Sequence, residues 1–245
     1  MSFVDLNSDL GEEVGDDAAM FGIVTSANVA CGFHAGGGQT MLASARLAFA
    51  KQVSLGVHPS YRDREGFGRR ATEIDASALI DDILEQVDAL RIAADDAGTV
   101  VRYLKPHGAL YNRIAVDPAQ AAAVARVAHA AALPLLGLAG TAIHAAADSH
   151  GVPFYRESFV DRAYLPDGTL APRSLAGAVI TDPVVVAERA VAMVLDGTVQ
   201  AIDGTMIRLR PDSLCVHGDT PGAVVMAALV REKLLDAGVE LRAFV

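Results

Sequence analysis

The sequence has few cysteines, fewer basic than acidic residues, and no long apolar run. Its longest apolar stretches are broken by Gly, Pro or charge well short of the ~18 residues that a membrane span needs. The net charge of −10, from 30 acidic and 20 basic residues, leaves no basic stripe that could follow a phosphate backbone. We therefore expect no membrane partner and no nucleic-acid partner.

Other signals are also missing from this chain. Its first residues lack the charged segment, apolar core and cleavage site of a secretory signal, so we expect a cytoplasmic location. Cys31 and Cys215 are then expected to be free thiols rather than a bridge. The segment 32–40 has Gly38 where a Walker-type phosphate loop requires lysine, which excludes an ATP site of that type.

At 245 residues and 25.5 kDa, the length matches one barrel-sized α/β domain over residues 1–245, although two smaller domains would also fit it. The chain is 52% hydrophobic, with a mean hydropathy of +0.32, which provides for a large core. No segment has the composition of a linker. We therefore expect a single domain.

Short apolar runs alternate with stretches of 3.6-residue periodicity, and this alternation requires parallel strands joined by crossover helices. Asp117 and Asp182 each precede a proline, which is typical of a helix start, and Asp75 also stands at an N-cap position. Glycines end several of the expected helices. The expected strands are 3–6, 24–30, 53–57, 100–104, 133–138, 152–155 and 213–216, and the expected helices are 40–51, 76–97, 118–131, 183–195 and 221–237.

This pattern favours an α/β fold, an irregular (β/α) barrel of about seven parallel strands, over an open doubly wound sheet. The sequence leaves open whether the barrel closes. The segment 161–180 is rich in Gly, Pro and Arg and has weak periodicity, so we interpret it as a rim loop or lid. Polar residues that follow the strands would then meet at one rim of the barrel.

The first polar group follows directly from strand alternation. Asp5, Asn7 and Asp9 alternate with apolar residues, which places them on one face of a strand, and Glu12 follows. Crowded carboxylates repel unless a cation or a proton joins them. The group therefore favours a divalent metal site or a general acid/base pair with separated pKa values. The simpler alternative is that these side chains cap loops.

Two histidines follow the next two apolar runs. In segment 25–36, small residues let the backbone approach a ligand, and Asn28 and His34 supply directed hydrogen bonds. His58 ends the following run. Neither histidine belongs to an H-E-x-x-H zinc signature, so a metal site would have to be assembled from separate strands. The alternative for each is a structural histidine.

The segment 105–112 is the most reaction-like motif. Lys105, one of only three lysines, ends an apolar strand and could hold a carboxylate or phosphate. His107 beside it could shuttle protons, with a pKa lowered by that charge, and Tyr111 follows. The alternative is a surface lysine next to a turn histidine.

Two more segments could bind an anion. Segment 215–222 ends a strand and opens a helix, where free amides favour negative charge, and it carries His217 and Asp219. Cys215 could be a nucleophile, but a buried structural cysteine is favoured. Arg69 belongs to a charged patch, 62–70, that could grip an anionic substrate or form a solvated loop with internal ion pairs.

Taken together and in order, these motifs resemble the LamB/YcsF family along practically the whole chain. The segments that carry the resemblance are 5–12, 25–36, 58–61, 66–70, 105–112, 161–164 and 213–223. The chain departs from the family pattern at two places. It is shorter than typical relatives after Glu12, and Gly37-Gly38 stand where the family usually has Asp-Pro.

The resemblance implies hydrolysis of 5-oxoproline to glutamate, performed with 5-oxoprolinase subunits B and C and with ATP and Mg²⁺ in the assembled complex. Phosphorylation of the lactam oxygen would activate the ring for attack by water, which needs a base, while the leaving nitrogen needs an acid. We expect Asp9 or Glu12 as base, His107 or His34 as proton shuttle, and Lys105 as electrostatic clamp. The expected substrate-binding residues are Asn7, Asn28, His58, Arg69, Tyr111, His217 and Asp219.

The family's barrel is also similar to that of the glycoside hydrolase/deacetylase superfamily, whose polysaccharide deacetylases hold a divalent metal with an Asp and two His. The nearest candidates for such a metal here are Asp9, His34 and His58. This gives an alternative function, a metal-dependent amidase or carbohydrate deacetylase that acts alone. A third interpretation is a non-catalytic subunit that only shapes a site completed by partners.

Overall fold

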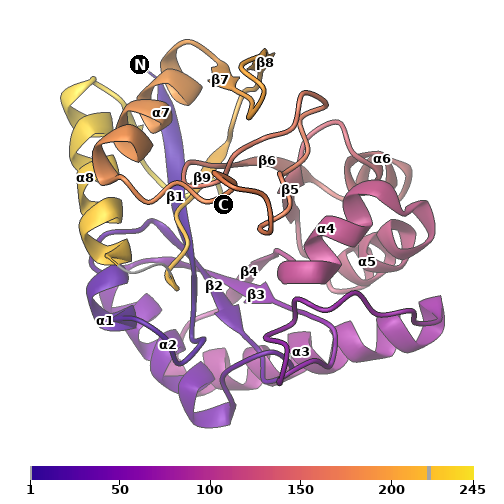
Figure 1. Ribbon diagram of the computed structural model, residues 1–245. Helices are drawn as coiled ribbons and strands as arrows, with labels where there is room; N and C mark the ends of the chain where they lie inside the picture. The colour runs from indigo at the N-terminus through magenta and orange to yellow at the C-terminus, as the bar shows by residue number, and fades with distance from the viewer. Residues whose placement is uncertain (1, 220–221) are drawn as a thin grey trace.

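The fold is a closed barrel of seven parallel strands with helices around it (Figure 1). In the computed structural model, which describes residues 2–219 and 222–245, β9 pairs with both β6 and β1 and so closes the circle. The predicted barrel of about seven parallel strands is confirmed, and it is closed. In order around the barrel, the strands are β1 (Phe3–Leu10), β2 (Ser26–Ala30), β3 (Ser54–His58), β4 (Val101–Leu104), β5 (Leu135–Leu138), β6 (Phe154–Phe159) and β9 (Ser213–Cys215).

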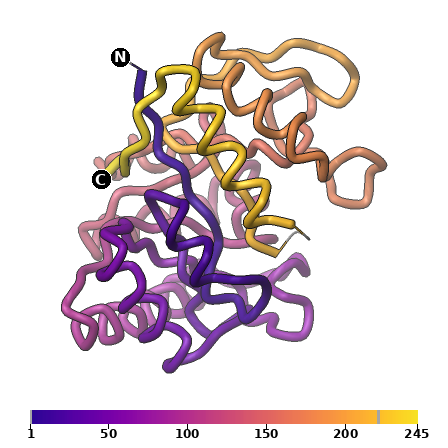
Figure 2. Tube along the Cα trace, turned by 90° about the vertical axis from the view of Figure 1, so that its left-hand side faces the viewer, coloured from indigo at the N-terminus to yellow at the C-terminus, as the bar shows by residue number. Residues whose placement is uncertain are grey.

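Three further strands lie outside the barrel wall. β10 (Glu240–Leu241) pairs in parallel with the start of β1, so both ends of the chain lie on the same side of the molecule, as Figure 2 shows. β7 (Thr198–Gln200) and β8 (Met206–Arg208) form a separate antiparallel pair. Among the helices of the described residues, none combines the length and the apolar character needed to cross a bilayer.

Five helices correspond to those expected from the periodicity, and two of them, α3 and α7, have the expected bounds. The expected start of the last helix at Pro221 lies outside the described residues. Three shorter helices were not predicted, because four to nine residues hold too few turns to show a period. The expected five are α2 (Gly38–Lys51), α3 (Ala76–Ala97), α5 (Pro118–Ala130), α7 (Pro183–Leu195) and α8 (Ala223–Asp236); the others are α1 (Asp17–Met20), α4 (Gly108–Val116) and α6 (Ala142–Ser149).

Side-chain caps fix both helix starts at which an aspartate precedes a proline. Asp117 accepts hydrogen bonds from the first backbone N–H groups of α5, and Asp182 does the same for α7, as their sequence positions predict. Asp75 occupies the N-cap position of α3, but its side chain makes no capping bond. Gly98 ends α3 with φ of 75°, a left-handed conformation that glycine adopts without strain.

The interior of the barrel is polar, whereas most barrels of this kind are filled by branched apolar residues. Asn28 donates to Asp9 Oδ1 at 2.9 Å and to Asn7 Oδ1 at 2.8 Å, and Tyr103 donates to Asn28 Oδ1 at 2.7 Å. All four side chains are buried. Buried polar groups of this kind must be satisfied by one another, so the network fixes the position of Asp9.

Gly56 makes room for this network. It pairs with Tyr103 across β3 and β4, and a Cβ atom at position 56 would lie 2.3 Å from carbons of the tyrosine ring. We predict that Gly56→Ala lowers the free energy of unfolding by about 3 kcal/mol, because the ring has no space to retreat. Gly38→Ala is the matched control, since a Cβ there meets no atom within 4 Å. Urea unfolding of both variants tests this, and equal stabilities would contradict it.

Asp5 is fully buried and precedes Asn7 and Asp9 on the same strand, β1. Its carboxyl accepts hydrogen bonds from Thr25 at 2.5 Å, from Ser26 at 2.6 Å and from Ser213. Burial raises the pKa of Asp5 to about 6, although the three hydroxyl groups oppose the shift. The folded chain therefore holds this proton at pH values where an unfolded chain has lost it, because an exposed aspartate has a pKa of about 4.

This shift predicts a loss of stability as the pH rises. The contribution of Asp5 is complete below about pH 4 and disappears as the pH approaches 6, with a full size of about 3 kcal/mol. Asp5→Asn should flatten this part of the stability profile, because asparagine carries no titrating proton. Urea unfolding between pH 4 and 7 measures it, with Asp81→Asn on the exposed face of α3 as control. An unchanged slope in Asp5→Asn would count against the prediction.

Candidate active site

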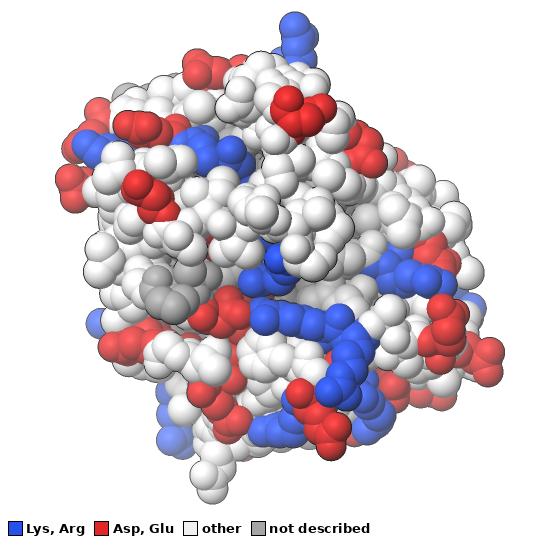
Figure 3. Space-filling model, in the orientation of Figure 1, with Lys and Arg blue, Asp and Glu red and all other residues white. Residues whose placement is uncertain are grey.

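A cavity of about 510 Å³ opens at the carboxyl ends of the barrel strands. Figure 3 shows Lys and Arg side chains gathered around a hollow on this face. Nine of the twelve residues expected from the sequence line the cavity, whereas Asn7, Asn28 and His34 lie behind its wall. The nine are Asp9, Glu12, His58, Arg69, Lys105, His107, Tyr111, His217 and Asp219.

Segment 161–180 forms one side of this cavity. Residues 169–173 and Arg162 line it, which confirms that the segment is a rim loop. Two isolated bridges, Arg162 to Val179 and Tyr164 to Leu170, hold the loop together. Its movement as a lid stays a prediction.

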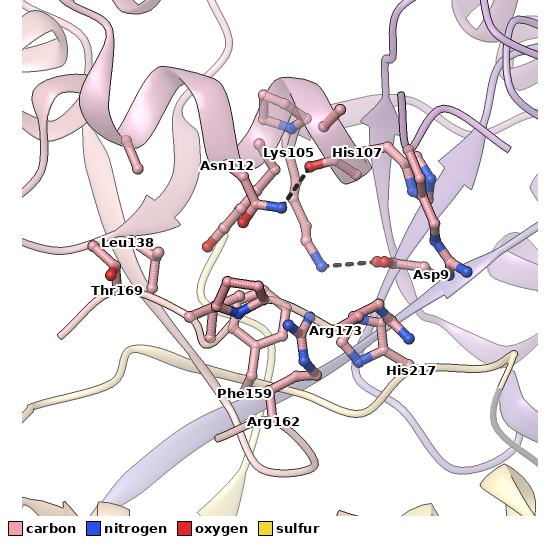
Figure 4. Close-up of a pocket in the computed structure, with 18 of the residues that line it drawn as sticks. Asp9, Lys105, His107, Asn112, Leu138, Phe159, Arg162, Thr169, Arg173 and His217 are labelled. Atoms are coloured by element: carbon pink, nitrogen blue, oxygen red, sulfur yellow. Dashed lines mark hydrogen bonds and ion pairs between the residues drawn. The ribbon is translucent and has the colours of Figure 1, made fainter. Parts of the chain in front are cut away.

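Lys105 lies at the floor of the cavity between two carboxylates. Its Nζ is 2.7 Å from Asp9 Oδ1 and 2.8 Å from Glu157 Oε1, and the residue is 1% exposed (Figure 4). Burial would lower the pKa of Lys105, but the neighbouring groups, Asp9 first and then Cys215 and Glu157, together outweigh it, and the pKa lies well above its ordinary value. Lys105 is therefore a charged ammonium group whose charge is balanced inside the chain.

Glu157 was missed by the sequence analysis. The expected strand ended at residue 155, whereas β6 runs to Phe159 and carries Glu157 into the barrel. The signal that could have found it is strand alternation. If the expected strand had been taken two residues further, the alternation would have placed Glu157 on the inward face. Tyr111 lies near Glu157, and neither its hydroxyl group nor either carboxylate oxygen makes an aligned hydrogen bond among the described residues.

Three histidines and Glu12 form a buried cluster beside this pair. Each ring has one nitrogen that faces outward to a fixed acceptor. His58 Nδ1 lies 2.8 Å from the carbonyl of Lys105, and His107 Nε2 lies 2.9 Å from the carbonyl of Phe67. These carbonyls can only accept, so both outward nitrogens carry the proton.

The same holds for His34. Its Nδ1 lies 2.9 Å from Ser60 Oγ, and that hydroxyl already donates its proton to the carbonyl of Tyr61. Ser60 therefore accepts from His34. In each of the three rings the other nitrogen points into the cluster.

These inward nitrogens face one another across short distances. His58 Nε2 and His107 Nδ1 are 2.9 Å apart, and Glu12 Oε1 lies 3.2 Å from His34 Nε2 and 3.3 Å from His107 Nδ1. Two lone pairs at this distance repel unless a proton or a cation lies between them. Burial lowers the pKa of His34 to about 2 and that of His107 well below its ordinary value. The four groups, Glu12, His34, His58 and His107, could bind a metal ion.

This grouping differs from the one expected from the sequence, and so does the cause of one pKa shift. The expected metal ligands were Asp9, His34 and His58, but the structure places Glu12 and His107 with the two histidines and groups Asp9 with Cys215 and His217. Asp9 Oδ2 still lies 3.2 Å from His58 Nε2. The pKa of His107 is lowered as predicted, but burial is the main cause, followed by His34 and His58 rather than by Lys105.

A pair formed by a histidine and an aspartate lies on the other side of the cavity. His217 Nδ1 is 2.9 Å from both carboxylate oxygens of Asp161, which is fully buried. Burial would raise the pKa of Asp161, but His217 and its hydrogen bonds outweigh this and hold the pKa below its ordinary value. The aspartate therefore keeps the proton of His217 on Nδ1. Nearby, Asp219 forms an ion pair with Arg69, so this arginine of the charged patch is paired outside the patch.

Both cysteines are free and buried, as predicted. Lys105 Nζ lies 3.3 Å from Cys215 Sγ, yet burial raises the pKa of this thiol well above its ordinary value. A thiol that resists ionisation is a poor nucleophile. This favours the structural interpretation of Cys215.

Comparisons with known proteins are consistent with this geometry. A model of the LamB/YcsF family matches residues 4–245. The 5-oxoprolinase A subunit of Mycobacterium avium (strain 104) is 51% identical over 251 residues that cover 100% of both chains, and that of Cutibacterium acnes (strain DSM 16379 / KPA171202) is 49% identical with 99% of each covered. The crystal structure of the lactam utilization protein from Thermus thermophilus is 43% identical, with a TM-score of 0.93 over 98% of this chain and 99% of that one.

Proposed function

The chain belongs to the LamB/YcsF family, and on that premise we propose that it is the A subunit of a 5-oxoprolinase. It would open the lactam ring of 5-oxo-L-proline to give L-glutamate, together with subunits B and C. The names of the full-length relatives and of the lactam utilization protein support this proposal. The observation that carries it is the cavity floor, where Asp9, Lys105 and His217 surround a space that can hold a five-membered ring.

Opening of a lactam by water needs two proton transfers. Asp9 is placed to take the proton of the attacking water, because it lines the cavity and its carboxylate is fixed by Lys105 and Asn28. His217 is placed to give a proton to the ring nitrogen as the C–N bond breaks. Asp161 fixes its Nδ1 proton and would stabilise the imidazolium form, which leaves Nε2 for the substrate.

The buried cluster has the donor set of a metal site. Glu12, His34, His58 and His107 would hold a divalent ion, since three neutral imidazoles and one carboxylate suit such ions and each ring is fixed by its outward nitrogen. When bound, the ion would polarise the carbonyl group of the substrate. We therefore assign His34 and His107 to the cluster rather than to proton shuttling, because both nitrogens of each ring already face a fixed group.

In this proposal, subunits B and C bind the ATP and Mg²⁺. An amide carbon is a poor electrophile, and phosphorylation of its oxygen makes it open to attack by water. When the C–N bond then breaks, the phosphate stays on the new carboxyl group as an acyl phosphate, and a second water molecule releases it as inorganic phosphate. The sequence of this chain lacks a Walker-type loop, so subunits B and C would supply the phosphoryl transfer.

The test is glutamate release from 5-oxoproline with ATP and Mg²⁺, measured for this chain alone and for its mixture with subunits B and C. We expect glutamate only in the mixture, in step with ADP formation. The buried cluster favours one competing function, a metal-dependent amidase that acts alone. Glutamate release by the metal-loaded chain without ATP would support that alternative, and turnover by subunits B and C without this chain would reject both.

A further inference from the structure

The rim loop brings two arginines to the cavity that the function proposed above has not used. Arg162 and Arg173 both line the cavity, and Figure 4 shows them with His217 on the side away from Asn112. Neither forms an ion pair within residues 2–219 and 222–245. The other cations of the cavity are different, because Lys105 is paired with Asp9 and Glu157, and Arg69 is paired with Asp219.

Arg162 is the unusual member of the pair because it is only 5% exposed. Its Nη2 donates to the carbonyl of Ala171 at 2.7 Å, and its Nε donates to the carbonyl of Ala178 at 3.3 Å. A guanidinium group has five N–H donors, so these two bonds leave three without a partner among the described residues. The neighbouring carboxylate of Asp161 is committed to His217.

The loop holds Arg162 in a fixed place. The backbone carbonyl of Arg162 accepts a hydrogen bond from Arg189 Nη2 at 2.9 Å. Within the loop, the small buried residues Ala163, Ala171 and Ala178 pack together. Burial, helped by the charge of Arg173, lowers the pKa of Arg162 to about 10, so it stays charged at neutral pH. The charge of Asp161 acts on Arg162 from nearby, but no ion pair joins the two side chains, so the three remaining N–H donors stay available to an anionic ligand.

We propose that Arg162 and Arg173 form the subsite for an oxyanion of the substrate. This rests on the proposed function, and it names the group that this side of the cavity recognises. Paired guanidinium groups match the planar oxygens of a carboxylate and also those of a phosphate. The oxyanion is therefore either the carboxylate of 5-oxoproline or the phosphate of its activated form, and it anchors the ring against the rim opposite the floor that carries Asp9 and Lys105.

A binding experiment separates the two sources. Isothermal titration calorimetry of the full chain, alone and assembled with subunits B and C, would use 5-oxoproline, 2-pyrrolidinone and inorganic phosphate as probes. 2-Pyrrolidinone has the same lactam ring without the carboxylate. Arg173→Gln tests the exposed arginine without disturbing the loop, Arg162→Gln tests the buried one, and Arg208→Gln on β8 is the control because it lies outside the cavity.

We expect Arg173→Gln and Arg162→Gln to weaken binding of one oxyanion roughly 10- to 100-fold, to leave 2-pyrrolidinone binding unchanged and to raise KM more than they lower kcat. A loss for 5-oxoproline identifies the carboxylate, and a loss for phosphate identifies the phosphoryl group. Unchanged binding in Arg173→Gln overturns the subsite, as does a wild-type chain that binds no oxyanion. Arginine-dependent phosphate binding without any glutamate release by the complex would support the subsite and reject the proposed function.

Discussion

Replacement of Lys105 by methionine is expected to lower the free energy of unfolding by about 4 kcal/mol and to abolish turnover. The substitution removes the cation that lies between Asp9 and Glu157 and leaves two carboxylates inside the barrel with no opposite charge beside them. Breaking a buried pair from one side costs about 3–5 kcal/mol, because the remaining charge has neither water nor a partner. Glu157 would be worst placed, since neither of its oxygens makes an aligned hydrogen bond in the described residues.

A double variant distinguishes this electrostatic cause from simple loss of packing. Lys105→Met combined with Glu157→Gln should recover a good part of the stability, because one uncompensated charge is removed, while turnover stays absent. Lys233→Met on α8 is the control for the loss of a lysine at an exposed position. Urea unfolding and glutamate release measure the two effects. A Lys105→Met chain as stable as the control, or a double variant no more stable than Lys105→Met, would contradict this account.

The fold followed closely from the sequence because periodicity and caps are local signals. Asp117 and Asp182 cap their helices as expected, and α3 and α7 have the expected bounds. Closure of the barrel could not be predicted in the same way. It depends on the pairing of β1 with β9, more than 200 residues apart, and no local pattern records which strands meet.

Site residues could be predicted where a polar side chain directly follows an apolar strand in the sequence. They could not be predicted where their role depends on contacts between distant segments of the chain. His34, His58 and His107 could be named because each follows an apolar run, but the sequence could not show that Glu12 rather than Asp9 lies among all three. Arg162 stands out in the sequence only as part of a motif. Its buried, unpaired state depends on carbonyl groups nine and sixteen residues further along the chain.

Replacement of Asp9 by asparagine is expected to lower kcat about 10³-fold while the chain stays folded. Asparagine keeps the Oδ1 that accepts from Lys105 at 2.7 Å and from Asn28 at 2.9 Å. The new Nδ2 takes the place of Oδ2, which lies 3.2 Å from Nε2 of His58, and the neutral form of that ring can accept a hydrogen bond from it. The local structure therefore tolerates the amide, whereas an amide cannot take a proton from water, and loss of a general base costs about 10²–10⁴ in rate.

The stability readout makes this prediction specific to catalysis. Asp9→Asn should unfold at nearly the same urea concentration as the wild-type chain, whereas Lys105→Met should not, although both alter the same ion pair. Asp82→Asn is the control, since that carboxylate pairs with Arg62 on the surface and does not line the cavity. Glutamate release by the complex assembled from each variant gives kcat and KM. If Asp9→Asn retains wild-type kcat, Asp9 is not the base, and the proposed division of roles between Asp9 and His217 fails with it.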